Sequence, residues 1–451
     1  MNSNAASSLN PLSSPGKMVL LGLQHVLVMS ASAVAFPRLI GEALRLPADQ
    51  IAGMISAALL VGGLITLVQS LGVGRFGIRL PVMMGVSFAG SGAMLAIGSD
   101  PNLGLAGVFG AMLVSGLLCI VLAPLLGRLR YLFPPVVIGS ILLTIGMSLL
   151  DISAHWMAGG AGVTDFGSPT YLCVAFGVLL VVMALLKFGR GFVRNVAILI
   201  GLAAGMIVCV ARGLATLDGV AQAPWLEIVR PFHLAGLKFE PWSIVAMCVV
   251  MLVNTVETAG VFMALGELTG VEVRRRDIVR GFRADGLGTA LAAVFNVFPY
   301  TTYAENVGLL VATGVRSRFV TATAAGILVV LALFPKLAAV IAAVPVYVLG
   351  SVSMITFGMI CVAAIRVLAK VDYERNTANA WIVAVSVGIG MTPAFAPKFF
   401  QFFPPSLAPL LHSGVVLAAL VAVSLNGVLN ARRSDTQDTQ NTQNTQDTQM
   451  S

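Results

Sequence analysis

Long apolar runs, separated by short polar or charged stretches, dominate this chain. Most runs approach the roughly 20 residues that an α-helix needs to cross the hydrocarbon core of a bilayer. Charged residues, Gly and Pro bound fourteen such segments, which predict a polytopic membrane protein built of helices. Their expected bounds are 18–36, 51–71, 82–98, 105–126, 132–150, 171–188, 196–211, 242–268, 286–298, 303–313, 319–343, 346–369, 377–391 and 407–429.

The third and tenth segments are short, and Gly, Pro or polar residues interrupt both of them. Fourteen segments divide into seven and seven, so the two interrupted segments occupy the same place in each half. This pattern is typical of inverted-repeat transporters whose binding site lies near the middle of the membrane. Irregular backbone at that depth must be buried in protein or line a cavity. The two segments are therefore the first candidates for a binding site.

The same pattern predicts the organisation of the chain. The stretch after the first segment, FPRLIGEALRLP, lacks a small-residue cleavage site, so that segment is not a cleavable signal. The tail DTQDTQNTQNTQDTQ contains no apolar residue and is expected to be disordered. The expected parts are a cytoplasmic leader (1–17), a first repeat with segments one to seven (18–211), an extracytoplasmic connector (212–241), a second repeat with segments eight to fourteen (242–430) and the tail (431–451).

Composition and charge agree with a membrane protein. Hydrophobic residues make up 58% of the chain and charged residues 10%, against about 25% charged residues in soluble domains. With both termini in the cytoplasm, 20 of the 27 Lys and Arg residues fall in inside loops, as the positive-inside rule requires. The net charge of +8 therefore reflects topology and does not require nucleic-acid binding. The seven expected outside are Arg38, Arg45, Arg212, Arg230, Lys238, Lys336 and Lys398.

Two carboxylates stand out inside apolar segments. Glu257 lies in the middle of segment eight, and Glu305 lies in the interrupted tenth segment. A charged side chain at the centre of a membrane helix costs roughly 2.5–3.5 kcal/mol, so each should face the protein interior. The bland alternative is a structural carboxylate, which for Glu257 would be bonded to Asn254 or to a neighbouring helix. Because burial disfavours the charged form, such groups can also take up and release a proton.

Other residues add candidate chemistry around these carboxylates. His25 is interpreted either as a proton carrier or as a core histidine that orients a carboxylate. Asp285 is expected to be the N-cap of segment nine, with some role in coupling. The breaks at Gly85 and Gly308 can expose backbone N–H groups at half-helix starts. Phe88 offers an aromatic face for a planar ring, so the pocket suits a planar imide such as a nucleobase, although other small solutes remain possible.

Several other functions are disfavoured. The segments contain no HExxH, paired-Asp or Gly-x-Ser-x-Gly motif, so we expect neither an enzyme nor catalytic residues. Five cysteines without ligand-like spacing and four scattered histidines predict no metal site and no cofactor. We expect a proton as the coupling ion, because the carboxylates within the membrane suffice to carry it. No set of oxygen ligands that could surround a sodium ion can be identified in the sequence. A rival is an anion transporter of the same architecture, which the two acidic residues argue against.

Several motifs, in order along the chain, resemble one family. TTYAENVGLLVATG is similar to the tenth-helix motif of the nucleobase–ascorbate transporters, the nucleobase:cation symporter-2 family. That motif has an acidic or amide residue, Asn, any residue, Gly, four residues and Thr, which here are Glu305, Asn306, Gly308 and Thr313. The resemblance extends over 17–430 through LQH, VMMGVSF, NTVETAG, ADGLGTALAAVFNVFP and FGMICVAAIRVL.

The resemblance implies an all-α fold with fourteen transmembrane segments in a 7+7 inverted repeat. It also implies short strands in segments three and ten, and a core (segments 1–4 and 8–11) that rocks against a gate (5–7 and 12–14). A homodimer in the bacterial inner membrane would import a nucleobase together with a proton, or with sodium as the less favoured ion. By resemblance, the base is bound by Glu257, Glu305, Phe88, Ser32 and the backbone at Tyr303 and Ala304, and the supporting or coupling residues are His25, Asp285, Asn306, Gly308 and Thr313.

The motif gives mixed signals about the substrate. Uracil carriers of the family have Glu at the position of Glu305, where purine carriers have Gln. Gly314 follows Thr313 here as it does in purine carriers, whereas uracil carriers have Arg. VETAGVFMALGELTG also resembles the xanthine and urate branch. We therefore expect an oxidised purine, xanthine or urate, with uracil as the alternative.

Overall fold

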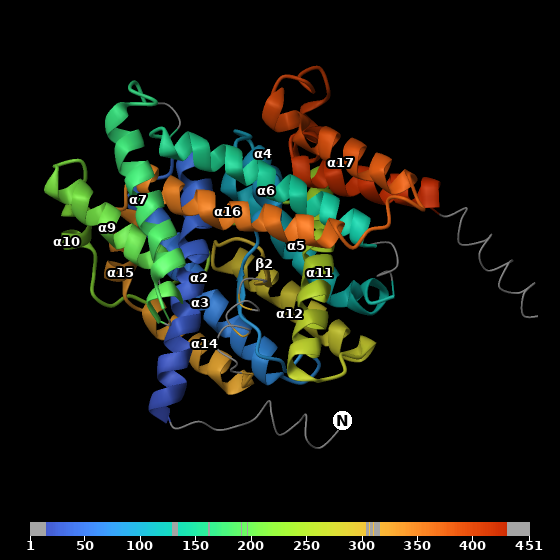
Figure 1. Ribbon diagram of the computed structural model, residues 1–451, viewed down its shortest axis with the longest axis horizontal. Helices are drawn as coiled ribbons and strands as arrows, with labels where there is room; N and C mark the ends of the chain where they lie inside the picture. The colour runs from blue at the N-terminus through green and yellow to red at the C-terminus, as the bar shows by residue number, and fades with distance from the viewer. Residues whose placement is uncertain are drawn as a thin grey trace, which may run out of the picture.

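The computed structural model describes residues 15–128, 134–160, 163–190, 192–195, 197–303, 306, 310 and 316–430. These residues form a bundle of helices with two very short strands near its centre (Figure 1). The elements, in chain order, are α2 (Pro15–Ala43), α3 (Ala48–Leu71), β1 (Met84–Val86), η1 (Phe88–Gly90), α4 (Ser91–Gly98), α5 (Gly104–Leu126), α6 (Pro135–Met157), α7 (Pro169–Phe188), α8 (Phe192–Asn195), α9 (Ala197–Ala211), α10 (Asp218–Gln222), α11 (Pro241–Thr269), α12 (Arg275–Val294), β2 (Tyr300–Thr302), α14 (Arg318–Ala332), α15 (Pro335–Ala342), α16 (Val346–Leu368), α17 (Ala378–Phe395), η3 (Pro405–Leu407), α18 (Ala408–Leu411) and a last helix, Gly414–Asn430.

Several helices match the expected spans closely, and local chemistry explains where they begin. Within the described residues, seven helices are long and apolar enough to cross a membrane, namely α3, α5, α6, α7, α11, α16 and α17. A proline opens α6, α7 and α11, where its fixed φ suits a first turn and its missing N–H costs nothing. At α11 the Glu240 carboxylate also accepts hydrogen bonds from the N–H groups of Trp242 and Ser243, at 3.0 and 2.5 Å.

Some expected bounds are wrong. Segment nine begins at Arg275 and not at residue 286, because the arginine-rich stretch forms the first turns of α12. Its start is stabilised by the Asp277 carboxylate, which accepts a hydrogen bond from the Arg274 N–H at 3.3 Å. Segment eleven is two helices, α14 and α15, because the ring of Pro335 cannot continue the preceding helix. Arg38, expected in an outside loop, is a buried residue within α2.

The helices pack in two groups. The first contains α2, α3, α4, α5, α11, α12, α14 and α15, and its most extensive contacts join α12 with α5 and α14 with α3. The second contains α6, α7, α9, α16 and α17, and its most extensive contacts join α16 with α6, α17 with α6, and α7 with α9. Contacts between the groups are few, and they involve mainly α2 and α11 of the first group.

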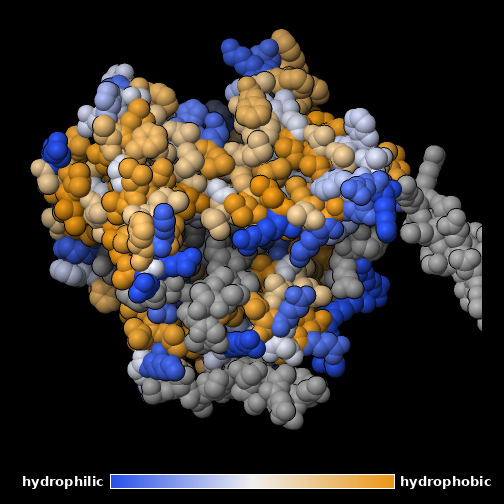
Figure 2. All heavy atoms as spheres, in the orientation of Figure 1, coloured by the Kyte–Doolittle hydropathy of each residue, from blue (hydrophilic) through white to orange (hydrophobic). Residues whose placement is uncertain are grey.

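The outer surface is apolar where a bilayer would touch it. Figure 2 shows hydrophobic side chains over much of the viewed face, including the region of α7 and α9. Most of α7 is not covered by the rest of the chain, and Phe176, Leu180 and Met183 on it are exposed. Large apolar side chains are left exposed in this way where lipid tails replace water as the solvent.

Candidate functional site

The two short strands pair in the middle of the first helix group. β1 and β2 run antiparallel, with Met84 opposite Thr302, Gly85 opposite Thr301 and Val86 opposite Tyr300. β1 lies within segment three and contains the predicted break at Gly85, so the expectation of a strand in that segment is confirmed. The second strand, Tyr300–Thr302, lies directly before the expected start of segment ten. The site is thus built on irregular backbone enclosed by protein.

Side chains from the surrounding helices satisfy the ends of this strand pair. The Met84 N–H donates to the hydroxyl of Thr66 on α3, at 2.9 Å. On the other strand, the Tyr300 N–H donates to the hydroxyl of Thr289 on α12, at 3.2 Å. Buried backbone donors need such partners because no water reaches them. Both threonines are fully buried, so the helices hold the strands in a defined position.

Gly85 has a different role from the one expected. It lies within β1, and the half-helix begins only at η1 and α4, so Gly85 does not expose an N–H group at a helix start. Instead, a Cβ on Gly85 would lie 2.0 Å from the ring of Tyr303. The Tyr303 N–H donates to the carbonyl of Met83 at 3.0 Å. The glycine thus makes room for a tyrosine that crosses the strand pair.

Phe88 is the first residue of η1, just after β1, and lies in a cluster of aromatic rings. Its ring meets Phe36 of α2 and Phe357 of α16 edge to face, each with ring centroids 5.0 Å apart. Phe36 also contacts Phe298, just before β2, at 5.1 Å. Such T-shaped pairs are a preferred aromatic geometry. Because α16 belongs to the second helix group, Phe88 lies where the two groups meet.

Glu257 is half-buried on α11, a helix that contacts β2 and the short η1 helix after β1. Three residues before it, the Asn254 side-chain oxygen accepts a hydrogen bond from the Ser87 hydroxyl at 2.7 Å. The next residue, Thr258, has its hydroxyl 3.2 Å from that of Thr301 in β2. Glu257 therefore lies on α11 at the level of the strand pair.

His25 and Asn306 meet although 281 residues separate them in the chain. The His25 Nδ1 lies 2.5 Å from the Asn306 side-chain oxygen, and both residues are buried. The Asn306 amide nitrogen donates to the carbonyl of Pro81 at 3.2 Å, just before β1. This link ties α2 to both interrupted segments. It supports the interpretation of His25 as a residue that orients a neighbour, although that neighbour is an amide and not a carboxylate.

Asp285 is not an N-cap. Arg274 occupies the N-cap of α12, and Asp285 lies well inside that helix, with no exposed surface. One carboxylate oxygen accepts a hydrogen bond from the Gln69 side chain of α3 at 3.1 Å. The other oxygen has no hydrogen-bond partner within the described residues. Glu257 is close enough to interact electrostatically with Asp285, so the two acids belong to one polar region.

Part of the expected site lies outside the described residues, namely Ala304, Glu305, Gly308 and Thr313. Ser32 lies within α2, and its side chain is likewise not described. Among the residues that the structure describes, no group of three His, Cys, Asp or Glu side chains could hold a metal ion.

Sequence reasoning missed several polar residues that hold the site together. Gln69 joins α3 to α12, because its amide nitrogen also donates to the Gly281 carbonyl at 3.2 Å. Asn254 and Thr258 join α11 to Ser87, the residue after β1, and to Thr301 of β2. Gln69 could have been found by the argument applied to Glu257, since it is a costly polar side chain in an apolar segment. Ser87 and Thr258 carry no such signal, because serine and threonine are common in membrane proteins.

The fold is that of known membrane transporters. The structure resembles the transmembrane domain of the cyanobacterial bicarbonate transporter BicA, with a TM-score of 0.58 and 16% identity, over 91% of this chain and 96% of that one. It also resembles the murine anion transporter Slc26a9 in its inward-facing state, with a TM-score of 0.64 and 11% identity, over 95% of this chain and 71% of that one. At these identities the likeness defines the fold only. This protein is a multi-pass membrane protein with a transporter fold.

The sequence comparisons define the family. Residues 16–399 match the Xan_ur_permease model, described as "Permease family". The uric acid transporter UacT of Escherichia coli (strain K12) is 44% identical over 92% of this chain and 87% of its own length. The xanthine permease of Bacillus subtilis (strain 168) is 37% identical over 92% and 94%, and its uric acid permease PucJ is 37% identical over 91% and 92%. The chain belongs to this permease family, the nucleobase:cation symporter-2 proteins, so the expected resemblance is confirmed and the protein is a transporter and not an enzyme.

Proposed function

We propose that this protein imports an oxidised purine, urate or xanthine, together with a proton. The observation that carries the proposal is similarity along nearly the whole chain to permeases named for these two bases, at 37–44% identity. The half-buried Glu257 beside the strand pair adds a carboxylate able to accept hydrogen bonds from the N–H groups of a base. Uracil is the alternative substrate, on the strength of Glu305 in the family motif.

The complete architecture in this proposal is fourteen spans in two inverted repeats of seven. The symmetry of the helix contacts supports it. In this architecture, each span of the first half corresponds to the span seven places later in the second half. Exchanging counterparts replaces α5 (span four) by α14 (span eleven) and α12 (span nine) by α3 (span two). The contact of α5 with α12 thus corresponds to the contact of α14 with α3, and both are present. The same exchange replaces α17 (span thirteen) by α7 (span six) and α6 (span five) by α16 (span twelve). The contact of α17 with α6 thus corresponds to that of α16 with α7, and the contact of α16 with α6 corresponds to itself.

Transport follows by alternating access in this proposal. The first helix group is the core, which carries the strand pair, Glu257, Asp285 and the His25–Asn306 link. The second group is the gate, and the few contacts between the groups favour rigid movement of one against the other. The Phe88–Phe357 contact joins core to gate directly beside the candidate site.

In the bound state, Glu257 and Glu305 accept hydrogen bonds from the base, and Phe88 contacts its ring. Ser32 and the backbone at Tyr303 and Ala304 complete the pocket. Asp285 is buried with one oxygen unpaired among the described residues, and it supports proton coupling together with His25 and Asn306. Gly308 and Thr313 shape the tenth segment. The protein works as a homodimer in the bacterial inner membrane, with both termini in the cytoplasm.

The test is uptake of labelled xanthine in cells that lack their own base carriers, with unlabelled urate, hypoxanthine, uracil and thymine as competitors. Urate should compete, and a protonophore should abolish accumulation. Competition by uracil alone would assign the protein to the pyrimidine carriers, and uptake that survives the protonophore but requires sodium would overturn proton coupling. Absence of uptake of every base would overturn the proposed function.

A further inference from the structure

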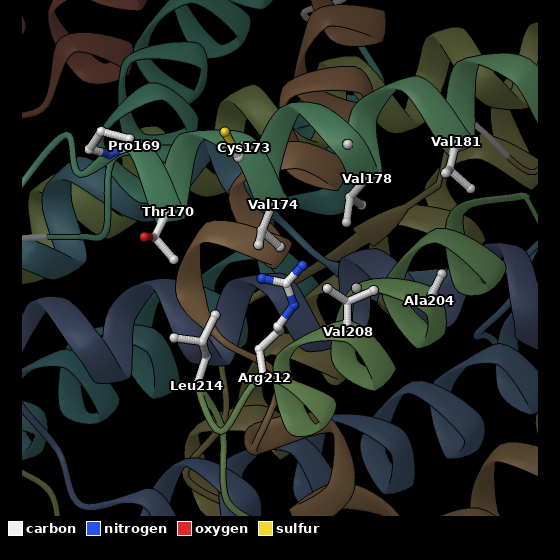
Figure 3. Close-up of a pocket in the computed structure, with 12 residues that line it drawn as sticks. Pro169, Thr170, Cys173, Val174, Val178, Val181, Ala204, Val208, Arg212 and Leu214 are labelled. Carbon is white, nitrogen blue, oxygen red and sulfur yellow. The ribbon is translucent and has the colours of Figure 1, made fainter.

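A cavity of about 680 Å³ lies away from the candidate substrate site, in the outer part of the gate. It opens between α7 and α9, and apolar side chains of both helices form most of its walls (Figure 3). Val174, Val178 and Val181 line it from α7, and Ala204 and Val208 line it from α9. None of these residues belongs to the transport site described above.

One end of the cavity is polar. The Arg212 guanidinium, directly after α9, points between the two helices toward Val174, and the Thr170 hydroxyl lies in the first turn of α7 on the opposite wall (Figure 3). Arg212 is exposed and, within the described part of the chain, its guanidinium makes no hydrogen bond or ion pair. The first turn of α7 also carries backbone N–H groups that favour an anion. The cavity therefore combines a cationic end with a long apolar wall.

The expected depth of Arg212 in the membrane agrees with a cavity that has a cationic end and an apolar wall. Its helix, α9, has 15 residues, which corresponds to a length of about 22 Å at 1.5 Å per residue. Arg194 precedes α9 and Arg212 follows it, so cations flank the apolar helix at both ends. Such flanking arginines lie at the level of the lipid headgroups, while the helix between them lies among acyl chains.

We propose that this cavity binds one anionic phospholipid of the surrounding bilayer, with its phosphate at Arg212 and Thr170 and an acyl chain along the valines of α7. Charge complementarity and the amphipathic shape of the cavity favour this occupant. The lipid would lie between two helices of the gate and would bind independently of transport.

The test measures lipid retained by the full-length protein purified in mild detergent. Native mass spectrometry after addition of phosphatidylglycerol or phosphatidylcholine should show one phosphatidylglycerol held per chain, in preference to phosphatidylcholine. Arg212→Gln removes the phosphate partner and should weaken retention about tenfold, the loss expected for one charged hydrogen bond. Arg230→Gln is the matched control, since Arg230 is an exposed arginine on the same expected side that does not line the cavity.

A second variant blocks the cavity without disturbing the fold. A Cβ on Gly177 would meet open space, so Gly177→Leu should be accepted by α7 and occupy the cavity from within. Gly427→Leu is its control, because Gly427 is equally open and lies on the last helix. Only Gly177→Leu should abolish retention.

Equal retention by the wild type, Arg212→Gln and Gly177→Leu would overturn the proposal, as would equal losses in Arg212→Gln and Arg230→Gln. The exposed Cys173 in the cavity wall provides an independent check. Rapid oxidative cross-linking of two chains through Cys173 in membranes would show that a second copy occupies the cavity, and it would overturn the lipid assignment.

Discussion

At the scale of single residues, the central prediction concerns Glu257. The variant Glu257→Gln keeps the size of the side chain but loses its charge, and with it the strong acceptor of a hydrogen bond. Such charged hydrogen bonds contribute about 1.5–3 kcal/mol, so the apparent affinity for the base should fall by about tenfold to a hundredfold. Proton-driven accumulation should be lost as well, and uptake of labelled xanthine by cells measures both effects.

Glu267→Gln is the control for this prediction. Glu267 is also on α11, but it is exposed near the end of the helix. Normal accumulation by Glu257→Gln, at normal protein levels in the membrane, would contradict the assignment of Glu257 to the binding site.

A second prediction at this scale concerns the close approach of Gly85 and Tyr303. Gly85→Ala places a methyl group 2.0 Å from the tyrosine ring, so the ring or the strand must move. Overpacking of this kind costs about 1–3 kcal/mol. The melting temperature of the purified protein should fall, and Tyr303→Ala in the same chain should restore part of it. A melting temperature unchanged by Gly85→Ala would contradict the described contact.

The sequence predicts which single residues carry the chemistry better than it predicts which residues they contact. The cost of a polar group in a membrane identifies His25, Glu257 and Asp285 as candidates from the sequence alone. It does not predict that His25 meets Asn306, because that contact depends on how distant segments pack. The apolar pattern places Asp285 at the head of segment nine, but the arginines before it form the exposed first turns of α12, so Asp285 lies well inside that helix.

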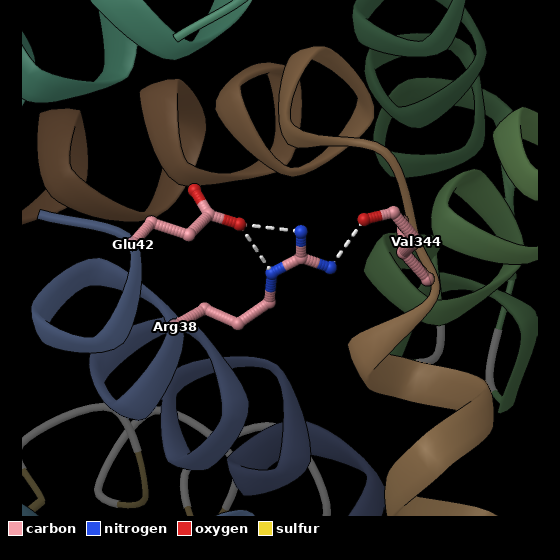
Figure 4. Close-up of polar contacts among 3 residues, drawn as sticks. All are labelled: Arg38, Glu42 and Val344. Atoms are coloured by element: carbon pink, nitrogen blue, oxygen red, sulfur yellow. Dashed lines mark hydrogen bonds and ion pairs between the residues drawn. The ribbon is translucent and has the colours of Figure 1, made fainter. Parts of the chain in front are cut away.

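At the scale of elements, the buried Arg38 links α2 to the connection between α15 and α16. Its guanidinium forms an ion pair with Glu42, one helical turn further along α2, at 2.5 Å (Figure 4). A second nitrogen donates to the carbonyl of Val344, in the short connection before α16. In the proposed architecture this connection leads from core to gate, so Arg38 holds the start of a gate helix against a core helix.

Replacing Arg38 alone should therefore be damaging. Arg38→Met leaves the partly buried Glu42 carboxylate and the Val344 carbonyl without this partner, and breaking a buried ion pair in this way costs about 3 kcal/mol or more. The amount of folded protein in the membrane and its melting temperature should both drop. The double variant Arg38→Met/Glu42→Leu removes both charges and should recover most of the loss. A double variant as unstable as the single one would contradict this account.

Element bounds were predictable where the sequence itself marks them. Prolines and polar caps explain why α7 and α11 begin close to their expected positions. Segment eleven was predicted as one span because its apolar residues continue past Phe334, while the proline that follows divides it into α14 and α15. An apolar run predicts that a segment lies in the membrane, but it does not predict whether that segment is one continuous helix.

At the scale of the whole molecule, the sequence predicts a repeat because segments three and ten, at the same place in each half, are both interrupted. It does not predict which helices pack together. The contacts of α5 with α12 and of α3 with α14 join opposite halves, and no local pattern in the sequence specifies such pairings. Polar side chains that join helices of opposite halves find their partners only when the two halves pack together. Gln69 of α3, which donates to the Gly281 carbonyl of α12, is an example.

The pairing of β1 with β2 has a consequence for how the protein is made. Met84 and Thr302 are 218 residues apart, so the ribosome completes the first strand long before its partner exists. Until then, the backbone groups of β1 that pair with β2 lack those partners, in an environment where unsatisfied groups are costly. The first half, synthesised alone up to residue 211, should therefore be inserted but degraded, and co-expression of residues 212–451 should protect it, as immunoblots during a chase would show. Assembly of the protein then depends on a late step, the pairing of the three residues of β2 with β1. A chain that has not completed this step remains a substrate for membrane proteases.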